Sequence, residues 1–83
     1  MKNQNTDRIK SINEFYSAPD TALFSQIIIA HVRDCSPATM ERDRWQGGGI
    51  PFIKIGRAVK YRKTDVLAWL EKHQAQNSTS EVA

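Results

Sequence analysis

Basic side chains gather between residues 54 and 63. This stretch holds five cations and no acid, whereas the first twenty residues hold three bases and three acids. Ammonium and guanidinium groups bind phosphate oxygens, and arginine can also bind guanine through two hydrogen bonds. A positive field on one segment therefore indicates an anionic partner such as DNA, although the formal net charge is only +3. The cations are Lys54, Arg57, Lys60, Arg62 and Lys63, and all except Arg57 are assigned to phosphates.

A short helix is predicted directly before this segment, at residues 37–46. Ser36 is its N-cap, because the hydroxyl can accept a hydrogen bond from a free N–H of the first turn, and Pro37 fits the first helical position. The glycines at residues 47–49 end the helix, since glycine readily adopts the positive φ of a helix C-terminus. Arg42 is best suited to a bidentate contact with guanine. The candidates for the DNA groove are Ala38, Thr39, Arg42 and Arg44, and Ser36 is a further candidate for a phosphate.

Residues 52–62 are predicted to form a two-stranded antiparallel ribbon from the sequences FIKI and VKYR, with its basic residues on the outer face. We expect a three-residue loop at residues 56–58, because that register aligns apolar residues in cross-strand pairs. The pairs are Ile55 with Val59 and Ile53 with Tyr61. The same register places Lys54 opposite Lys60, which is unfavourable unless an anion lies between them.

Another helix is predicted at residues 26–33, which read QIIIAHVR and follow the N-cap Ser25. Asp34 and Cys35 form the turn into the next helix and complete a helix-turn-helix. Two interpretations of the three isoleucines remain open. Either all three lie in the core, or Ile27 or Ile28 contacts an adjacent protomer, because contiguous exposed aliphatic side chains mark interfaces.

Residues 63–73 are predicted to form a helix that closes the core. Asp65 falls in its first turn, where a carboxylate is stabilised by the helix dipole. Val66, Trp69 and Leu70 follow at helical spacing and form one apolar face. We expect Trp69 and Leu70 to cover the apolar face of the ribbon.

The predicted domain spans residues 21–73. Residues 1–20 are expected to be a polar extension, and whether one short helix forms at residues 6–16 is left open. The apolar residues of this segment would either pack on the core of the domain or dock on a second copy of the protein. These residues are Ile9, Ile12 and Tyr16. Residues 74–83 are small and polar, so a disordered tail is expected there.

The segment from Phe24 to Leu70 combines SPATMER with GGGIPFIKIGRAVKYRKTDVLAWL and covers over half of the chain. It resembles the small winged helix-turn-helix domains of the excisionase and AlpA type, which are related to DNA-binding domains of the MerR type. The resemblance implies an α+β, mainly helical fold with a recognition helix at residues 37–46 in the major groove, a two-stranded wing and a closing C-terminal helix. The wing would reach the neighbouring minor groove or the backbone near Arg57. The most specific residues are Pro51, Lys54, Ile55, Gly56, Arg57, Val59, Tyr61, Arg62, Asp65, Val66, Trp69 and Leu70.

The chain departs from the family pattern around its predicted recognition helix. Asp43 and Arg44 stand where an aromatic or aliphatic core residue is common, and Arg33 stands at a position that is usually apolar. We expect Trp45 to supply the missing packing from its neighbouring position.

Residues for metal or covalent chemistry are few. His31 and His73 are far apart and Cys35 is the only cysteine, so no metal site is expected. No pair of nucleophile and base stands out, and we expect neither enzymatic activity nor a cofactor. No apolar run reaches the roughly 20 residues of a membrane span, and no signal peptide is recognisable. We therefore expect a cytoplasmic bacterial protein that is associated with the nucleoid when it binds DNA.

The main hypothesis is a sequence-specific DNA-binding protein of excisionase type, that is, a recombination directionality factor. By resemblance, such proteins bind double-stranded DNA beside a recombination site and steer an integrase, a tyrosine recombinase, towards excision of a mobile element. A short helix and a wing bind weakly alone, so cooperative binding of several copies side by side is expected. One alternative is a small transcriptional regulator of the same fold. Another is a protein-interaction module without DNA binding, which the acids Glu41 and Asp43 favour.

Overall fold

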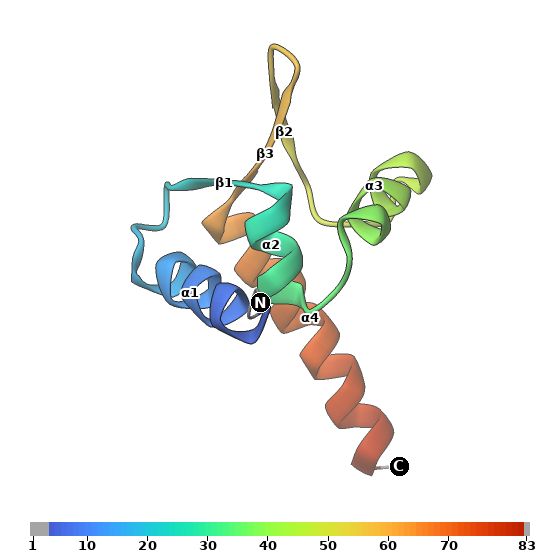
Figure 1. Ribbon diagram of the computed structural model, residues 1–83. Helices are drawn as coiled ribbons and strands as arrows, with labels where there is room; N and C mark the ends of the chain where they lie inside the picture. The colour runs from blue at the N-terminus through green and yellow to red at the C-terminus, as the bar shows by residue number, and fades with distance from the viewer. Residues whose placement is uncertain (1–3, 83) are drawn as a thin grey trace.

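The computed structural model describes residues 4–82, with side chains for residues 6–73. Its helices are α1 (Gln4–Ser17), α2 (Gln26–Arg33), α3 (Pro37–Gln46) and α4 (Lys63–Val82), and its strands are β1 (Leu23–Ser25), β2 (Ile53–Ile55) and β3 (Ala58–Arg62) (Figure 1). The fold is α+β and mostly helical, as predicted. None of the described helices has both the length and the apolar character that a membrane span needs. Residues 74–82, where a disordered tail was expected, are assigned to α4, and their side chains lie outside the described ones.

The helix α2 has the predicted bounds, but Ser25 at its start makes no side-chain capping hydrogen bond. Its end is made by a local turn. Asp34 adopts the left-handed conformation with a φ of 63°. The N–H of Cys35 donates to the carbonyl of Ala30 at 2.9 Å, and the N–H of Asp34 donates to His31 at 3.3 Å. These two bonds form a Schellman motif, which satisfies the last carbonyls of α2 and reverses the chain.

The helix α3 also has the predicted bounds. Ser36 caps its start, because the Oγ atom accepts a hydrogen bond from the N–H of Thr39 at 3.2 Å. Pro37 occupies the first helical position, and Gly47 ends the helix with a φ of 82°. Each cap lies within four residues of the groups that it satisfies, which is why the sequence alone predicted both ends.

The sheet has three antiparallel strands in the order β1–β3–β2, so a third strand joins the predicted two-stranded ribbon. Phe24 of β1 lies opposite Tyr61 of β3, and both side chains are buried. Residues directly opposite each other in an antiparallel pair point to the same face of the sheet. This pair therefore determines which face of β3 points into the core.

The predicted three-residue loop between β2 and β3 is wrong. A two-residue turn joins the strands and gives the pairs Ile53 with Lys60, Lys54 with Val59, and Ile55 with Ala58. Gly56 has a φ of 62° and Arg57 has no positive φ, as in the glycine-first hairpin turn whose twist matches that of its strands. Lys54 and Lys60 consequently lie on opposite faces and do not form the predicted pair.

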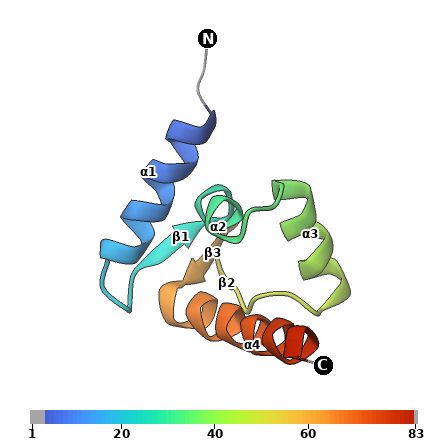
Figure 2. The same cartoon turned by 90° about the horizontal axis from the view of Figure 1, so that it is seen from below.

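The helix α1 settles the question left open for residues 6–16. It packs along α2, on the side of α2 opposite to α3 (Figure 2). Phe15 is fully buried, and Arg8 Nε donates to the backbone oxygen of His31 at 3.1 Å. The N-terminal segment therefore belongs to the packed core, while Ile9 and Tyr16 remain exposed.

The core takes buried residues from all four helices, from β1 and β3, and from the loop before β2. They are Phe15, Phe24, Ile29, Ala30, Met40, Ile50, Tyr61 and Val66. Val66 is the buried apolar residue of α4 in the part of the helix whose side chains are described, whereas Trp69 and Leu70 are half-buried at the edge of the core. Trp69 lies against α2, with the Arg33 guanidinium 4.5 Å from the centre of its ring.

An ion pair occupies the place where apolar packing was expected in α3. Arg33 Nη2 lies 2.6 Å from Asp43 Oδ2, and the two side chains are only 16% and 22% exposed. Trp45 is 91% exposed, so the prediction that it supplies this packing is wrong. At about 100° per residue, Trp45 lies about 140° around the helix from the buried Met40 and cannot turn towards the core.

Candidate nucleic-acid interface

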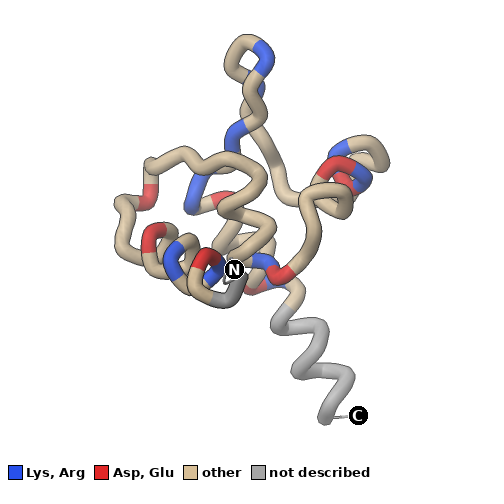
Figure 3. The backbone as a smooth tube through the Cα atoms, in the orientation of Figure 1, with Lys and Arg blue, Asp and Glu red and all other residues tan. Residues whose placement is uncertain are grey.

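A hollow of about 350 Å³ opens between the start of α2, α3 and the β2–β3 hairpin. The hairpin projects away from the helices, and basic positions continue along it to its tip (Figure 1, Figure 3). Cations from two elements line the hollow, namely Arg44 of α3 and Arg57 and Lys60 of the hairpin. A concave surface with cations on two of its walls concentrates positive potential and attracts a polyanion.

Arg44 holds α3 against the sheet and against α2. Its Nη1 atom donates to Gln26 Oε1 at 2.7 Å and to the hydroxyl of Tyr61 at 2.8 Å. The guanidinium also lies 5.8 Å from the centre of the Phe52 ring, and Gln26 Nε2 donates to Glu41 Oε2 at 3.0 Å. We call these five residues the Arg44 cluster. Because its guanidinium is engaged within the protein, Arg44 positions α3 beside the hairpin and is poorly placed to reach a base, contrary to its predicted role.

The face of α3 that points away from the core carries Ala38, Arg42 and Trp45, which we call the outer stripe. All three residues are exposed. Arg42 lies about 200° around the helix from Met40, which is buried. Ala38 and Arg42 were predicted as groove residues and do lie on this face. Trp45 was missed, because the sequence pattern assigned it to the core.

Ser36 and Thr39 lie at the start of α3. The Ser36 hydroxyl caps the helix and lies 3.1 Å from Thr39 Oγ1, so the two side chains contact each other. Ser36 is exposed, and the N–H groups of a first helical turn carry partial positive charge. A phosphate contact at this position stays a prediction.

The β2–β3 hairpin is basic on both faces and not on one face as predicted. Lys54 and Arg57 are exposed and Lys60 is half-buried. The register places Lys54 and Lys60 on opposite faces, with Arg57 in the turn between the strands. Arg62 lies at the base of the hairpin, where its Nη1 atom is 3.5 Å from Asp65 Oδ2, so part of its charge is balanced.

Lys63 is a structural residue and not a surface cation. Its side chain belongs to the core region, with only 7% of the residue exposed. The Nζ atom donates to the backbone oxygens of Tyr16 at 3.0 Å and of Ala18 at 2.6 Å. These bonds compensate for the burial of the ammonium group and satisfy carbonyls at the end of α1. The prediction that Lys63 contacts a phosphate is therefore wrong.

The three isoleucines of α2 have three different environments. Ile29 is fully buried, Ile28 is half-buried against the core, and Ile27 is 56% exposed. The interpretation that places all three in the core is wrong for Ile27. A protomer contact by Ile27 or Ile28 stays a prediction.

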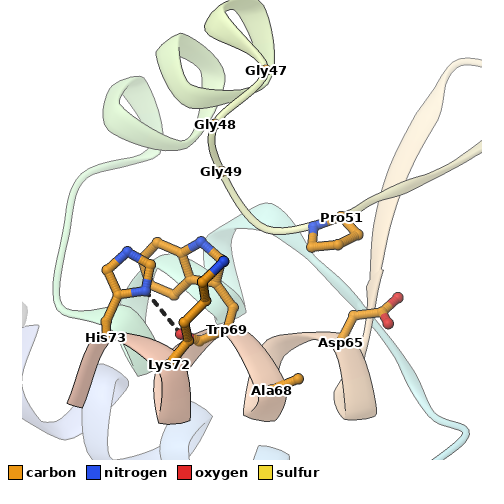
Figure 4. Close-up of a pocket in the computed structure, with 9 residues that line it drawn as sticks. All are labelled: Gly47, Gly48, Gly49, Pro51, Asp65, Ala68, Trp69, Lys72 and His73. Atoms are coloured by element: carbon orange, nitrogen blue, oxygen red, sulfur yellow. Dashed lines mark hydrogen bonds between the residues drawn. The ribbon is translucent and has the colours of Figure 1, made fainter. Parts of the chain in front are cut away.

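A second hollow, of about 470 Å³, lies between the glycine loop at residues 47–49 and α4 (Figure 4). Two of its polar side chains, those of His73 and Asp65, interact with neighbouring residues. His73 stacks on Trp69 at 3.8 Å between ring centroids, and its Nδ1 atom lies 2.9 Å from the Trp69 backbone oxygen. Asp65 lies beside Arg62. The contacts of these side chains lie within α4 or join it to the adjacent Arg62, and the lining includes no pairing of nucleophile and base.

Cysteine and metal chemistry find little support in the described residues. Burial raises the pKa of the Cys35 thiol, so the thiolate that acts as a nucleophile is disfavoured at neutral pH. Within the part of the chain that the structure describes, no three His, Cys, Asp or Glu side chains are grouped to hold a metal ion.

No family model matches the chain, and no curated protein matches its sequence.

Proposed function

We propose that the protein binds double-stranded DNA as a winged helix-turn-helix, with α3 as the recognition helix and the β2–β3 hairpin as the wing. The observation that carries this proposal is the hollow lined by Arg44 of α3 and by Arg57 and Lys60 of the hairpin. The Arg44 cluster joins α3 to the base of the hairpin, so the two elements can engage adjacent grooves of one duplex. The proposed activity is binding, with no chemical step.

The charge arrangement of the hairpin supports insertion into the minor groove. This groove is about 6 Å wide, and phosphates line both of its walls. With Lys54 on one face of the hairpin and Lys60 on the other, an inserted hairpin would reach the phosphates of both strands. Arg57 in the turn would lie nearest to the floor of the groove.

The charge arrangement of α3 supports its entry into the major groove. Arg42 lies on the outer stripe, where it can reach base edges, and the small Ala38 allows close approach. Asp43 is paired with Arg33, so its charge is balanced within the protein. This pairing weakens the case for a protein-interaction module, which depended on Asp43 and Glu41 as exposed acids.

Within this class we propose the excisionase role, in which the protein steers an integrase towards excision of a mobile element. We place the protein in the bacterial cytoplasm. The support for the excisionase role is the sequence resemblance over residues 24–70, which is independent of the geometry. A transcriptional regulator would grip DNA in the same way. A neighbouring integrase gene would favour the first role, and an operator beside a nearby promoter would favour the second.

Fluorescence anisotropy with a labelled random-sequence duplex of about two helical turns tests DNA binding. If about four phosphates are neutralised, the logarithm of affinity should fall against the logarithm of salt concentration with a slope between about −3 and −4. A variant with Lys54, Arg57 and Lys60 all replaced by alanine should reduce the slope to about −1. The matched control is Lys10→Ala, which removes an exposed cation of α1 and should leave the slope unchanged. A slope near zero for the native protein would contradict the proposal.

A further inference from the structure

Trp45 is the most exposed large apolar side chain in the described part of the chain. It is 91% exposed, whereas the next most exposed ones, Ile9 and Ile27, reach 56%. A tryptophan side chain offers about 150 to 250 Å² of surface that is stabilised by burial. No core position is within its reach, because it points away from Met40. This surface is therefore available to a partner that approaches α3 from outside.

The position of Trp45 on α3 indicates which partner that is. Ala38 lies two turns earlier at almost the same angle around the helix, and Arg42 lies between them, about 60° from Trp45. Trp45 is thus part of the surface that would face DNA when α3 occupies the major groove. The ring stands beside the cation that is placed to reach a base.

We propose that Trp45 contacts DNA directly and covers apolar carbon surface in the major groove, either the C5-methyl group of a thymine or the edge of a deoxyribose. This inference rests on the proposed function. It assigns to Trp45 a specificity role that its hydrophobic character and its neighbours in sequence did not indicate. Arg42 would supply the polar part of the contact and Trp45 the apolar part.

The surroundings of Trp45 favour DNA over a second copy of the chain. A stable interface between proteins buries about 800 Å² on each partner and has an apolar centre. The neighbours of Trp45 on the exposed side of α3 are Glu41, Arg42 and Gln46, which are polar and exposed. One indole ring among polar side chains is too little for such an interface, whereas the cations beside α3 complement a polyanion.

Fluorescence quenching tests the contact, because the chain has only two tryptophans. In the variant Trp69→Phe, Trp45 is the only fluorophore of this kind. The probe is a duplex selected from a random pool by the native protein, and the quencher is acrylamide. Binding of the duplex should at least halve the quenching constant of Trp45. In the companion variant Trp45→Phe, the half-buried Trp69 should be quenched almost equally with and without the duplex.

The affinity of Trp45→Ala for the same duplex provides the second readout. We expect its Kd to rise about tenfold, whereas Tyr16→Ala, which removes an exposed aromatic ring from α1, should change the Kd less than twofold. Thermal unfolding of Trp45→Ala should match that of the native protein, so a failure to fold does not explain the loss. Replacing the thymines of the duplex by deoxyuridine distinguishes the two carbon surfaces. If the native protein binds the deoxyuridine duplex more weakly than the thymine duplex and Trp45→Ala does not, the ring contacts a thymine methyl. If the native protein binds both duplexes equally well, the ring contacts a sugar.

Three outcomes would count against these proposals in different ways. If the native protein binds the duplex but Trp45 remains fully open to acrylamide, the contact is excluded and DNA binding stands. If Trp45→Ala binds DNA normally but sediments as a smaller species than the native protein, the ring belongs to an interface between copies. If the native protein binds no duplex at all, the proposed function fails, and this inference fails with it.

Discussion

The inner and outer faces of α3 differ in a way that reverses the usual distribution of residue types. On the inner face, Asp43 and Arg44 are half-buried and engaged by Arg33, Gln26 and Tyr61. On the outer face, Trp45 is almost fully exposed. Charged side chains attach this helix to the protein, and its largest apolar side chain is directed to the outside.

This difference shows that partner geometry, and not hydrophobicity alone, decides where a side chain of a short helix lies. A buried or half-buried charge is tolerated only when partners satisfy it, and Arg33 and Arg44 both have such partners. Only Met40 on the inner face is apolar and buried. The other contacts that hold α3 on the protein are polar. Single substitutions can therefore remove them one at a time.

The largest expected effect is on stability, and it distinguishes Met40 on the inner face from Trp45 on the outer face. Met40→Ala should lower the free energy of unfolding by about 3 kcal/mol, because it leaves a cavity in the core. Trp45→Ala should change it by less than about 0.5 kcal/mol, because the side chain packs on nothing. Urea denaturation measures both. Similar losses in the two variants would show that Trp45 is buried in solution and would remove the distinction between the faces.

The second prediction concerns the ion pair of the inner face. Asp43→Ala should destabilise the protein by about 2 kcal/mol, because it leaves the charge of Arg33 half-buried without a partner. The loss is smaller than for a fully buried pair, because water still reaches part of the Arg33 side chain. The matched control Asp20→Ala removes an exposed acid and should cost less than about 0.5 kcal/mol. The double variant Arg33→Met with Asp43→Leu should recover most of the loss, since apolar packing can replace such a pair. Equal unfolding midpoints for Asp43→Ala and Asp20→Ala would mean that the ion pair contributes nothing.

The third prediction distinguishes the two arginines of α3. Arg44→Met should lower the free energy of unfolding by about 1 to 2 kcal/mol, because Gln26 and Tyr61 lose a charged hydrogen-bond partner. Arg42→Met should leave stability unchanged but relax the base preference in a selection from random duplexes, whereas Lys60→Ala should weaken all sequences alike. An unchanged base preference in Arg42→Met would remove Arg42 from the reading of sequence.

The smallest expected effect is at the border between the two faces, where Glu41 is exposed and accepts a hydrogen bond from Gln26. Glu41→Gln should raise affinity for DNA about twofold to threefold at low salt, because it removes a negative charge near the phosphates. Glu71→Gln on α4 is the control and should have no effect. A loss of affinity in Glu41→Gln would instead indicate that the carboxylate accepts a hydrogen bond from a cytosine.

Much of the helical fold could be predicted from sequence, but the hairpin register could not. The pattern of the hairpin alone suggests a register that pairs apolar residues, and this register is wrong. The observed one follows from the two-residue turn at Gly56 and Arg57, whereas the pairing of Phe24 with Tyr61 fixes only which face of β3 points into the core. A distant residue therefore decided the face of Lys60, and the local turn decided the face of Lys54.

Only part of the candidate interface could be predicted, because contacts with distant residues decide which basic side chains are exposed. Arg42 and Arg57 are exposed, as their predicted roles require. Lys63 and Arg44 were assigned to DNA because both are basic and close in sequence to other basic residues. Nothing in the sequence shows that the carbonyls of Tyr16 and Ala18 would receive the Lys63 ammonium, or that Gln26 and Tyr61 would engage Arg44.

The sequence by itself determined both ends of α3 and the end of α2, because each of these ends is made by residues within a few positions of it. Ser36, Pro37 and Gly47 act through local hydrogen bonds and local backbone conformation. Only the tertiary structure decided that Arg44 and Lys63 lie inside and that Trp45 lies outside. These outcomes depend on partners from distant parts of the chain, whose positions are set when the helices pack on the sheet.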